Sequence, residues 1–448
     1  MPHTAEKQCL AYSVSLNKIR PEYDGQWQGI IAASDGACYF GSSTHSYRHG
    51  AGFFRFDPLS RQLSMLAEDM TGVCGEDLAR TPPQGKIHSP IVEADGWLYF
   101  TTHLSNYWEE ARNAFTGAHV LGYEMATGRF RDFGIVRPRY TIYSAINVDP
   151  VRQKLYVFSV PFASEDVEND GCHIYRIDIP TGEKQDLGRV VKGQTGSFWF
   201  FIDHKGDCWF TFWQMHGRCP EGGHGNLYRV VADTGAIERF ENVLPDCQLA
   251  PDGEPLPEVE QERRCWSWAA SLPGRQRCLF AMGHHSGEDE RLWLFDPGKD
   301  IEAGEAFQPV GFIGPTFLPV ALGKDRVFYI QRGDLVSARG WSAEGERDKD
   351  PATVPPEDLH LKSISLHPKA YGAVTDHGRL VDQDGRMPRH IDSLAADQEG
   401  RVYMVGSWHL LPGEAGTLQI AWDQPTREFH PVPRGQFFAY VDVSTDLG

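Results

Sequence analysis

The sequence lacks the features that mark membrane, secreted and nucleic-acid-binding proteins. It has no run of about 18 apolar residues, so no membrane-spanning helix is predicted. Residues 1–13 lack the charged-then-apolar pattern of a secretory signal, which favours a cytoplasmic location. Basic residues are too few to balance the acidic ones: 43 Lys and Arg against 61 Asp and Glu leave a net charge of −18. That balance argues against binding to nucleic acids or anionic membranes through bulk charge.

Paired cysteine motifs and helical periodicity are also missing. The nine cysteines contain no Cys-x-x-Cys pair and their number is odd, so reduced thiols are expected. No long stretch repeats its apolar residues with the period of a helix. Turn formers and aromatics are abundant instead, with 46 Gly, 29 Pro and 12% aromatic residues. This composition predicts short strands joined by many turns.

One pattern recurs along the chain: a strand, a tight turn such as Asp-Gly, and a second strand rich in aromatics. The pattern predicts hairpins near residues 27–41, 88–103, 143–158, 197–213, 266–283, 316–331 and 390–408. Further strands extend each hairpin to a four-stranded unit, at a spacing of about 50 to 70 residues. Because such a small sheet cannot bury both faces alone, repeated units stack around an axis. We therefore expect an all-β fold, a seven-bladed β-propeller of four-stranded antiparallel blades, with residues 1–448 as one domain. A large β-sandwich or two β-domains are the alternatives.

The second hairpin carries the clearest candidate for chemistry. Its turn lies at Asp95-Gly96, and His88 and His103 are equally far from that turn on the two arms. In an antiparallel pair such positions face each other, with Cβ atoms about 5 Å apart. Two imidazoles at the open end of one hairpin, beside the mouth of a propeller channel, favour an active site.

Other polar and aromatic residues are expected at the same mouth. Arg139 and Tyr140 precede the first strand of the next unit. Tyr107 and Trp108 follow His103 and offer aromatic surface of the kind that stacks on sugar rings. Gln84 and Lys86, which precede His88, offer an amide and a cation to an anionic substrate. Histidines of other units, His45, His390 and His409, are expected at the same channel mouth. The substrate-binding candidates are Gln84, Lys86, His45, Tyr107, Trp108, Arg139, Tyr140, His390 and His409.

The segment Pro83-Gln84-Gly85-Lys86-Ile87-His88, with the Gly-x-Leu-Tyr-Phe-x-Thr-His strand that ends at His103, resembles a known family. It is similar to the second-blade region of seven-bladed propeller polysaccharide lyases, which include ulvan lyases and rhamnose-glucuronate lyases. The resemblance covers residues 85–185 and continues in the pattern from Tyr143 to Gly182.

The resemblance implies a function and roles for four residues. A histidine and a tyrosine of the next blade, His88 and Tyr143, would serve as acid and base. A second histidine, His103, and an arginine, Arg176, would neutralise the substrate carboxylate. The expected reaction is β-elimination on a uronate-containing oligo- or polysaccharide, which removes the proton at C5 and expels the oxygen on C4. Removal of that weakly acidic proton requires neutralisation of the adjacent carboxylate.

Two other functions remain open at this stage. The first is a metal-dependent propeller enzyme, an oligogalacturonate-type lyase or a hydrolase, with histidines such as His88, His284, His390 and His409 around the metal. The second is a non-catalytic propeller that binds carbohydrate or protein. The expected elimination requires no cofactor and assigns no metal ligand, although a structural or catalytic divalent ion (zinc, manganese or calcium) stays open.

Overall fold

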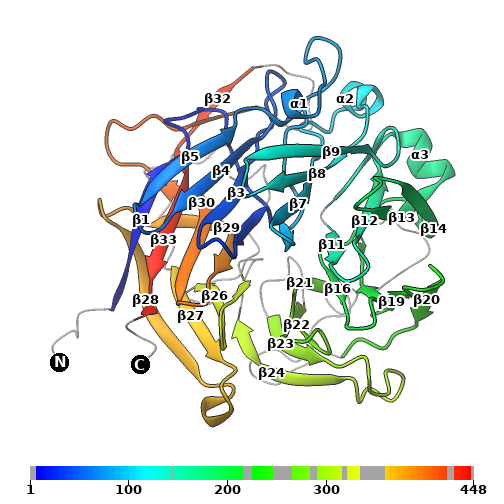
Figure 1. Cartoon of the computed structure of the whole chain (residues 1–448). Helices are drawn as coiled ribbons and strands as arrows, with labels where there is room; N and C mark the ends of the chain where they lie inside the picture. Colours follow the sequence, from blue (N-terminus) through cyan, green and yellow to red (C-terminus); the bar gives the residue numbers. More distant parts are fainter. Residues whose placement is uncertain are drawn as a thin grey trace.

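Figure 1 shows a computed structural model of the chain. The structure describes residues 7–143, 145–214, 225–245, 265–282, 290–314, 320–332, 359–420 and 428–444. In this described part the sheets form a ring, and short helices lie in the loops between strands. The helical segments are α1 (Met70–Val73), α2 (Glu109–Ala114), α3 (Ser164–Asn169) and a 3-10 turn at Pro368–Ala370. No helix in these ranges has the length and apolar character needed to cross a membrane.

Five of the sheets repeat one antiparallel four-stranded order, in which each strand pairs with the next along the chain. The first has β2 (Ile30–Ala32), β3 (Cys38–Ser42), β4 (Gly52–Asp57) and β5 (Gln62–Ala67). The second has β6 (Val92–Ala94), β7 (Trp97–Thr101), β8 (His119–Glu124) and β9 (Arg129–Ile135). The third has β11 (Ile146–Asp149), β12 (Lys154–Pro161), β13 (Gly171–Asp178) and β14 (Lys184–Lys192), with β10 (Tyr140–Thr141) added beside the end of β12.

The fourth and fifth sheets follow the same order. The fourth has β16 (Phe200–Ile202), β17 (Cys208–Phe210), β19 (Leu227–Val230) and β20 (Ile237–Phe240). The fifth has β21 (Trp266–Ser271), β22 (Cys278–Met282), β23 (Glu290–Phe295) and β24 (Phe307–Gly314). Two small pairs complete the set: β15 (Thr195–Gly196) with β18 (Trp213–Gln214), and β31 (Thr417–Gln419) with β32 (His430–Val432).

The last sheet has eight strands, in the order β25-β26-β27-β28-β1-β33-β30-β29. Its strands are β25 (Val320–Leu322), β26 (Arg326–Arg332), β27 (Leu359–Ser365), β28 (Val374–Asp382), β1 (Gln8–Ser15), β33 (Arg434–Asp442), β30 (Arg401–His409) and β29 (Pro388–Ala396). Strand β1 pairs parallel with β28 and antiparallel with β33, so the N-terminal strand joins two antiparallel halves.

The expected seven separate blades therefore appear as five four-stranded sheets and one eight-stranded sheet. The fold is all-β and propeller-like. In the last unit the strand that pairs with β30 on the side away from β29 is β33, whereas β31, which follows β30 in the chain, pairs with β32. The reason is the long-range pairing of β33 with β1, which the local pattern does not contain.

The core is a series of hydrophobic clusters between neighbouring sheets. Successive clusters join the first sheet to the second, and so on to the eight-stranded sheet. One more cluster, with Phe40, Phe54 and Phe438, joins the eight-stranded sheet back to the first and closes the ring. Phe40 and Phe438 stack at 4.7 Å between ring centroids, and each buried ring of this size stabilises the fold by about 1.5–3 kcal/mol. The seven described cysteines are buried free thiols, as expected.

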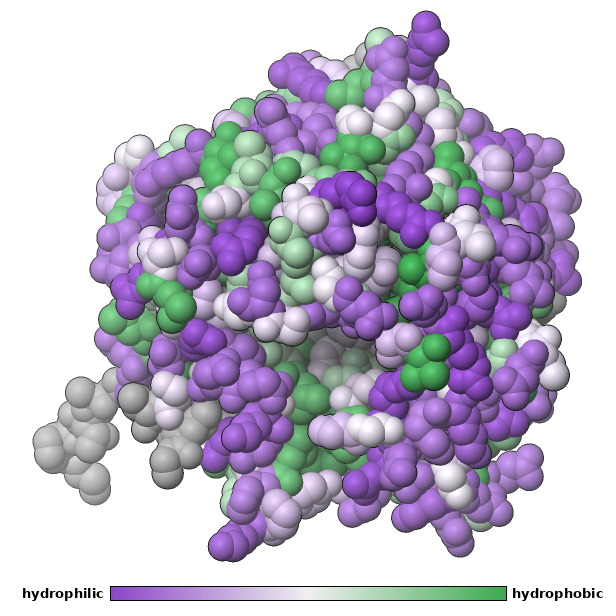
Figure 2. Space-filling view, in the orientation of Figure 1, coloured by the Kyte–Doolittle hydropathy of each residue, from purple (hydrophilic) through white to green (hydrophobic). Residues whose placement is uncertain are grey.

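The face of the molecule shown in Figure 2 is mainly hydrophilic, with a hollow near its centre where hydrophobic side chains are visible. Apolar surface inside a hollow bordered by polar side chains is a common setting for ligand binding in proteins of this size.

Candidate functional site

The site begins at the hairpin of β6 and β7. The pairs Val92–Tyr99 and Ala94–Trp97 flank the turn at Asp95-Gly96, as predicted. Both turn residues have positive φ, 51° at Asp95 and 79° at Gly96, which is the backbone of a tight hairpin turn.

Beyond these regular pairs the register of the hairpin changes, and the expected pairing of His88 with His103 is wrong. The residue that faces His103 across the hairpin is Lys86, not His88: backbone hydrogen bonds of 3.2 and 2.9 Å join Lys86 and His103 in both directions. The register changes between the regular pairs and Lys86–His103, because the amide of Thr101 donates to the side-chain oxygen of Ser89 (2.9 Å) instead of a backbone carbonyl. The chain from Ser89 back to Lys86 therefore follows a different path, and Lys86 enters the site.

The expected convergence of rings is present despite that shift. The ring of His88 lies between those of Trp27 and Tyr143, at centroid distances of 5.3 and 4.5 Å. The ring of His103 lies 5.2 Å from His88 and 5.3 Å from Tyr143. Phe162 closes the far side, 5.5 Å from His103. Residues of the first, second and third sheets thus meet in one aromatic cluster.

A chain of short polar contacts crosses this cluster. Lys86 Nζ lies 2.7 Å from Tyr107 Oη, and Tyr107 Oη lies 2.7 Å from His103 Nε2. On the other edge of the imidazole, His103 Nδ1 lies 2.5 Å from Thr141 Oγ1. The ammonium of Lys86 also lies over the rings of Tyr107 (4.2 Å) and Trp27 (5.3 Å), a cation–π arrangement.

Glycines make room for this packing. A Cβ atom on Gly85 would lie 2.2 Å from Cβ of Ser105, so only glycine fits before Lys86. A Cβ atom on Gly196 would lie 2.9 Å from the ring of Tyr143. These close approaches explain the glycine of the Gln-Gly-Lys element and let the ring of Tyr143 pack against Gly196 of β15.

Burial sets the protonation of the cluster. Burial lowers the pKa of Lys86 from 10.5 to about 7, although the carboxylate of Asp24 opposes this. It lowers the pKa of His88 to about 3, with Lys86 and His45 adding to the effect, and the pKa of His103 well below its usual 6.5. Burial also raises the pKa of Tyr143 to about 12. At neutral pH both imidazoles are therefore neutral, Tyr143 is protonated, and Lys86 carries a partial charge.

His45 belongs to the same cluster, as predicted for a residue at this mouth. Its ring lies 5.9 Å from Trp27 and 6.5 Å from Tyr107, and its Nδ1 lies 2.9 Å from a carboxylate oxygen of Asp24. Burial lowers the pKa of His45. Asp24 is thereby held beside both His45 and Lys86.

His390 and His409 lie in the eight-stranded sheet. His390 Nε2 lies 3.3 Å from Asp392 Oδ1. Asp392 is buried, which raises its pKa to about 7, and it accepts a hydrogen bond from the amide of Gln436 (2.8 Å). His409 is at the end of β30, opposite Arg434, and burial lowers its pKa. Asp392 also accepts a hydrogen bond from the backbone amide of Gln26 (3.3 Å), two residues after Asp24.

Arg176 is not at the cluster, and its expected role there is wrong. It pairs with Tyr156 in the middle of β12–β13 and donates to Ala232 O (2.6 Å) and Gln185 Oε1 (2.9 Å). The end of β12 that lies toward the cluster is its C-terminal end, where Pro161 pairs with Tyr140. Tyr156 is five residues before Pro161 on β12, which is about 17 Å along a strand.

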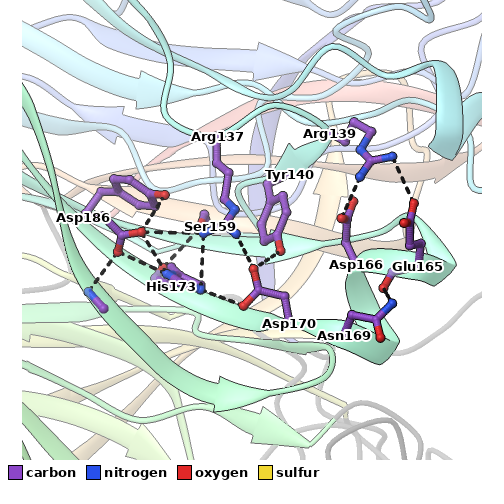
Figure 3. A network of polar contacts seen from close by, with 12 residues as sticks. Arg137, Arg139, Tyr140, Ser159, Glu165, Asp166, Asn169, Asp170, His173 and Asp186 are labelled. Carbon is purple, nitrogen blue, oxygen red and sulfur yellow. Dashed lines mark hydrogen bonds and ion pairs between the residues drawn. The ribbon is translucent and has the colours of Figure 1, made fainter.

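Arg139 and Tyr140 belong to a separate polar network (Figure 3). Arg139 donates to Asp166 (2.8 Å), and the hydroxyl of Tyr140 donates to Asp170 (2.8 Å). The sequence reasoning missed this network as a unit, although acidic residues at 165–170 follow the arginines at 137 and 139. Its members are Arg137, Arg139, Tyr140, Glu165, Asp166, Asp170, His173 and Asp186. It fastens α3 to the third sheet, and the substrate role of Arg139 and Tyr140 stays a prediction.

Gln84 is a structural residue in this arrangement. Its buried amide accepts from Thr102 Oγ1 (2.7 Å) and donates to Gly117 O (2.9 Å) and Glu76 Oε2 (3.0 Å). Those bonds occupy both N–H groups of the amide, so the predicted role in substrate binding is not supported. Trp108 is partly exposed and flanks the first turn of α2.

Trp27 and Asp24 are site residues that the sequence reasoning did not single out. Their position in the sequence could have indicated them. Trp27-Gln28-Gly29 precede the first strand of the first sheet in the same way that Lys86-Ile87-His88 precede the first strand of the second sheet. In the described ranges, no three or more His, Cys, Asp or Glu side chains are grouped so as to hold a metal ion. His284, named for the metal-dependent alternative, lies outside those ranges.

Comparison with known proteins finds only distant likenesses among solved structures. No protein-family model and no curated protein matches the chain. Among solved structures, an oligogalacturonate lyase from Vibrio parahaemolyticus is 10% identical, with 97% of this chain and 92% of that chain covered at a TM-score of 0.46. A putative 6-phosphogluconolactonase from Bacteroides uniformis is also 10% identical, with 81% and 87% covered at a TM-score of 0.45. Likenesses at this level carry no argument about the reaction of this chain.

Proposed function

We propose that the protein is a lyase that cleaves a uronate-containing oligo- or polysaccharide by β-elimination. The observation that carries the proposal is the convergence of His88, His103 and Tyr143 around a buried lysine, Lys86. A neutral imidazole, a protonated phenol and a cation in one place are the three kinds of group that the reaction requires.

Lys86 is the carboxylate-neutralising cation in this proposal, in place of Arg176. It is 2% exposed and lies between aromatic rings, so a bound carboxylate would meet it with little competition from water. The carboxylate would in turn favour the charged form of Lys86. Neutralisation of the carboxylate acidifies the adjacent C5 proton, which is the step that limits the uncatalysed reaction.

His88 and Tyr143 divide the proton transfers. His88 is neutral at physiological pH and so has a lone pair that accepts the C5 proton, while Tyr143 keeps its proton for the departing C4 oxygen. The low pKa of His88 makes it a weak base in the free protein. A bound anionic substrate raises that pKa, because a nearby negative charge favours the imidazolium.

We also propose that the ring is a seven-bladed propeller in a single domain. In the eight-stranded sheet, β25–β28 form one antiparallel half, and β29, β30, β33 and β1 form the other. Each half has the four strands of one blade, and the parallel pair β28–β1 joins their outer edges. Five sheets and two halves make seven units around the axis.

The test is an assay of the purified protein on a panel of uronate-containing glycans, with ultraviolet absorbance of the unsaturated product as the signal. The wild-type protein should produce this signal on at least one glycan, and His88→Ala should abolish it while leaving the melting temperature close to wild type. Binding without a signal on every glycan would leave a carbohydrate-binding protein and remove the proposed reaction.

A further inference from the structure

His45 and Asp24 form a pair that the proposed reaction does not use. His45 Nδ1 lies 2.9 Å from Asp24 Oδ2, and the backbone amide of His45 donates to the same oxygen (3.4 Å). The pair belongs to the aromatic cluster, because the ring of His45 is 5.9 Å from that of Trp27 and 6.5 Å from that of Tyr107. The ammonium group of Lys86 lies over the same two rings. A group held by His45 is therefore a neighbour of a group held by Lys86.

The backbone around His45 is fastened to two neighbouring segments. The amide of Ser43 donates to Gly25 O (2.9 Å), next to Asp24 in the chain. The amide of Thr44 donates to the carbonyl before Lys86, Gly85 O (2.8 Å). Both His45 and Asp24 are 6% exposed. The imidazole is thus held in one place before a ligand arrives, which lowers the entropy cost of binding.

His45 differs from His103 in what its ring has left to bond. The sequence Thr-His follows β3 and β7 alike, at His45 and His103. Both ring nitrogens of His103 are engaged, by Tyr107 Oη and Thr141 Oγ1. His45 is bonded through Nδ1, and within the part of the chain that the structure describes its Nε2 has no hydrogen-bond partner.

Asp24 decides which nitrogen of His45 carries the proton. Burial lowers the pKa of His45, so the imidazole is neutral at physiological pH. An ionised carboxylate only accepts hydrogen bonds, which puts the proton on Nδ1 and leaves a lone pair on Nε2. The other carboxylate oxygen, Asp24 Oδ1, is buried and has no partner among the described residues. The pair therefore presents acceptors that lack donors, an unfavourable state that a donor from a ligand relieves.

We propose that His45 is a substrate-binding residue that accepts a hydrogen bond from a ring hydroxyl of the uronate, and that Asp24 positions it. The inference rests on the proposed function, in which Lys86 holds the carboxylate of the same sugar. A hydroxyl that carries a methyl or sulfate group has no proton to donate, and the carboxylate of Asp24 repels a sulfate. The site therefore selects uronates with a free ring hydroxyl and rejects chains that are substituted there.

The experiment compares methyl glucuronide with its 2-deoxy and 3-deoxy analogues by NMR titration of wild-type protein labelled with ¹⁵N at histidine. The His45 signals, assigned by their loss in His45→Asn, should show the Nδ1–H tautomer and should shift when methyl glucuronide binds. One deoxy analogue should bind roughly tenfold more weakly than the parent sugar, because it leaves Nε2 without a donor.

Three variants test the roles of the pair. His45→Asn, whose amide can still bond Asp24 but has nothing at the place of Nε2, should bind the parent sugar as weakly as that analogue. Asp24→Asn should lower the share of the Nδ1–H tautomer of His45, since an amide also donates. His49→Asn is the matched control: the ring of His49 packs on Tyr23, and its loss should leave the discrimination intact.

Two results would overturn the inference: no binding of methyl glucuronide, or equal binding of the parent sugar and both analogues. An Nε2–H tautomer of His45 in the wild type, or an unchanged tautomer in Asp24→Asn, would remove the positioning role of Asp24. The absorbance assay judges the proposed function separately. A protein that forms unsaturated product but binds all three sugars equally is a lyase without this hydroxyl site. A protein that distinguishes the sugars but forms no product keeps the hydroxyl site and loses the lyase reaction.

Discussion

Replacement of Lys86 by methionine should make the protein more stable at neutral pH. Burial lowers the pKa of Lys86 from 10.5 to about 7, so the folded state disfavours the ammonium that the unfolded chain carries freely. At about 1.4 kcal/mol per tenfold change in proton affinity, the two pKa values differ by about 5 kcal/mol. Methionine removes that cost but leaves Tyr107 without its lysine partner, a loss of about 1–2 kcal/mol. The expected net gain is about 3 kcal/mol in the free energy of unfolding.

The pH dependence is the sharper part of the test. Between the folded and unfolded pKa values the unfolded state binds more protons, so the cost of Lys86 is full below about pH 7 and fades as the pH rises to about 10. Urea denaturation of the wild type and Lys86→Met should therefore show a large difference at neutral pH and a small one at alkaline pH. Lys154→Met, at a partly exposed lysine paired with Asp178, serves as a control that should not gain stability. A Lys86→Met protein that is less stable than wild type by the same amount at every pH would refute the reasoning.

Three further results are expected. Tyr143→Phe should lower kcat/KM of the proposed reaction by about 10²- to 10⁴-fold, whereas Tyr140→Phe should stay within about tenfold, since its hydroxyl is bonded to Asp170. His119→Gln should lose stability most below about pH 6.5. Burial alone would lower the pKa of His119, but hydrogen bonds with Asp132, Cys74 and Glu76 raise it to about 11, so the native advantage fades as the pH approaches that value in denaturation curves. Activity should survive dialysis against a chelator, because Lys86 supplies the neutralising charge; loss that is restored by zinc, manganese or calcium would favour the metal-dependent alternative.

Local pattern was sufficient for the hairpin and for the meeting of the rings. The Asp95-Gly96 turn and the alternating residues of β6 and β7 are neighbours in the chain, so the sequence contains the information that sets their register. The approach of Tyr143 to His88 follows from the equivalent position of both residues before the first strand of successive units.

Features that depend on distant partners could not be predicted in this way. The pairing of β1 with both β28 and β33 links residues more than 360 positions apart, as in Gln8 with Arg379, and no local pattern announces it. The site differs from the prediction because of one side chain. The Ser89 hydroxyl accepts a hydrogen bond from the amide of Thr101, and Lys86 instead of His88 lies opposite His103. The place of Arg176 could not be predicted because the sequence pattern assigns it to a strand without giving its distance from the cluster. That distance depends on the register between strands, in which Arg176 pairs with Tyr156.

The central claim is that bond cleavage occurs by elimination at the cluster around His88. The most direct measurement is the mass of each product formed from an active uronate glycan of known mass. Elimination breaks the bond between the C4 oxygen and C4 without adding water, so the account predicts one unsaturated product end and product masses that add up to the mass of the substrate. Product masses that add up to the substrate plus one water would show hydrolysis and contradict the account.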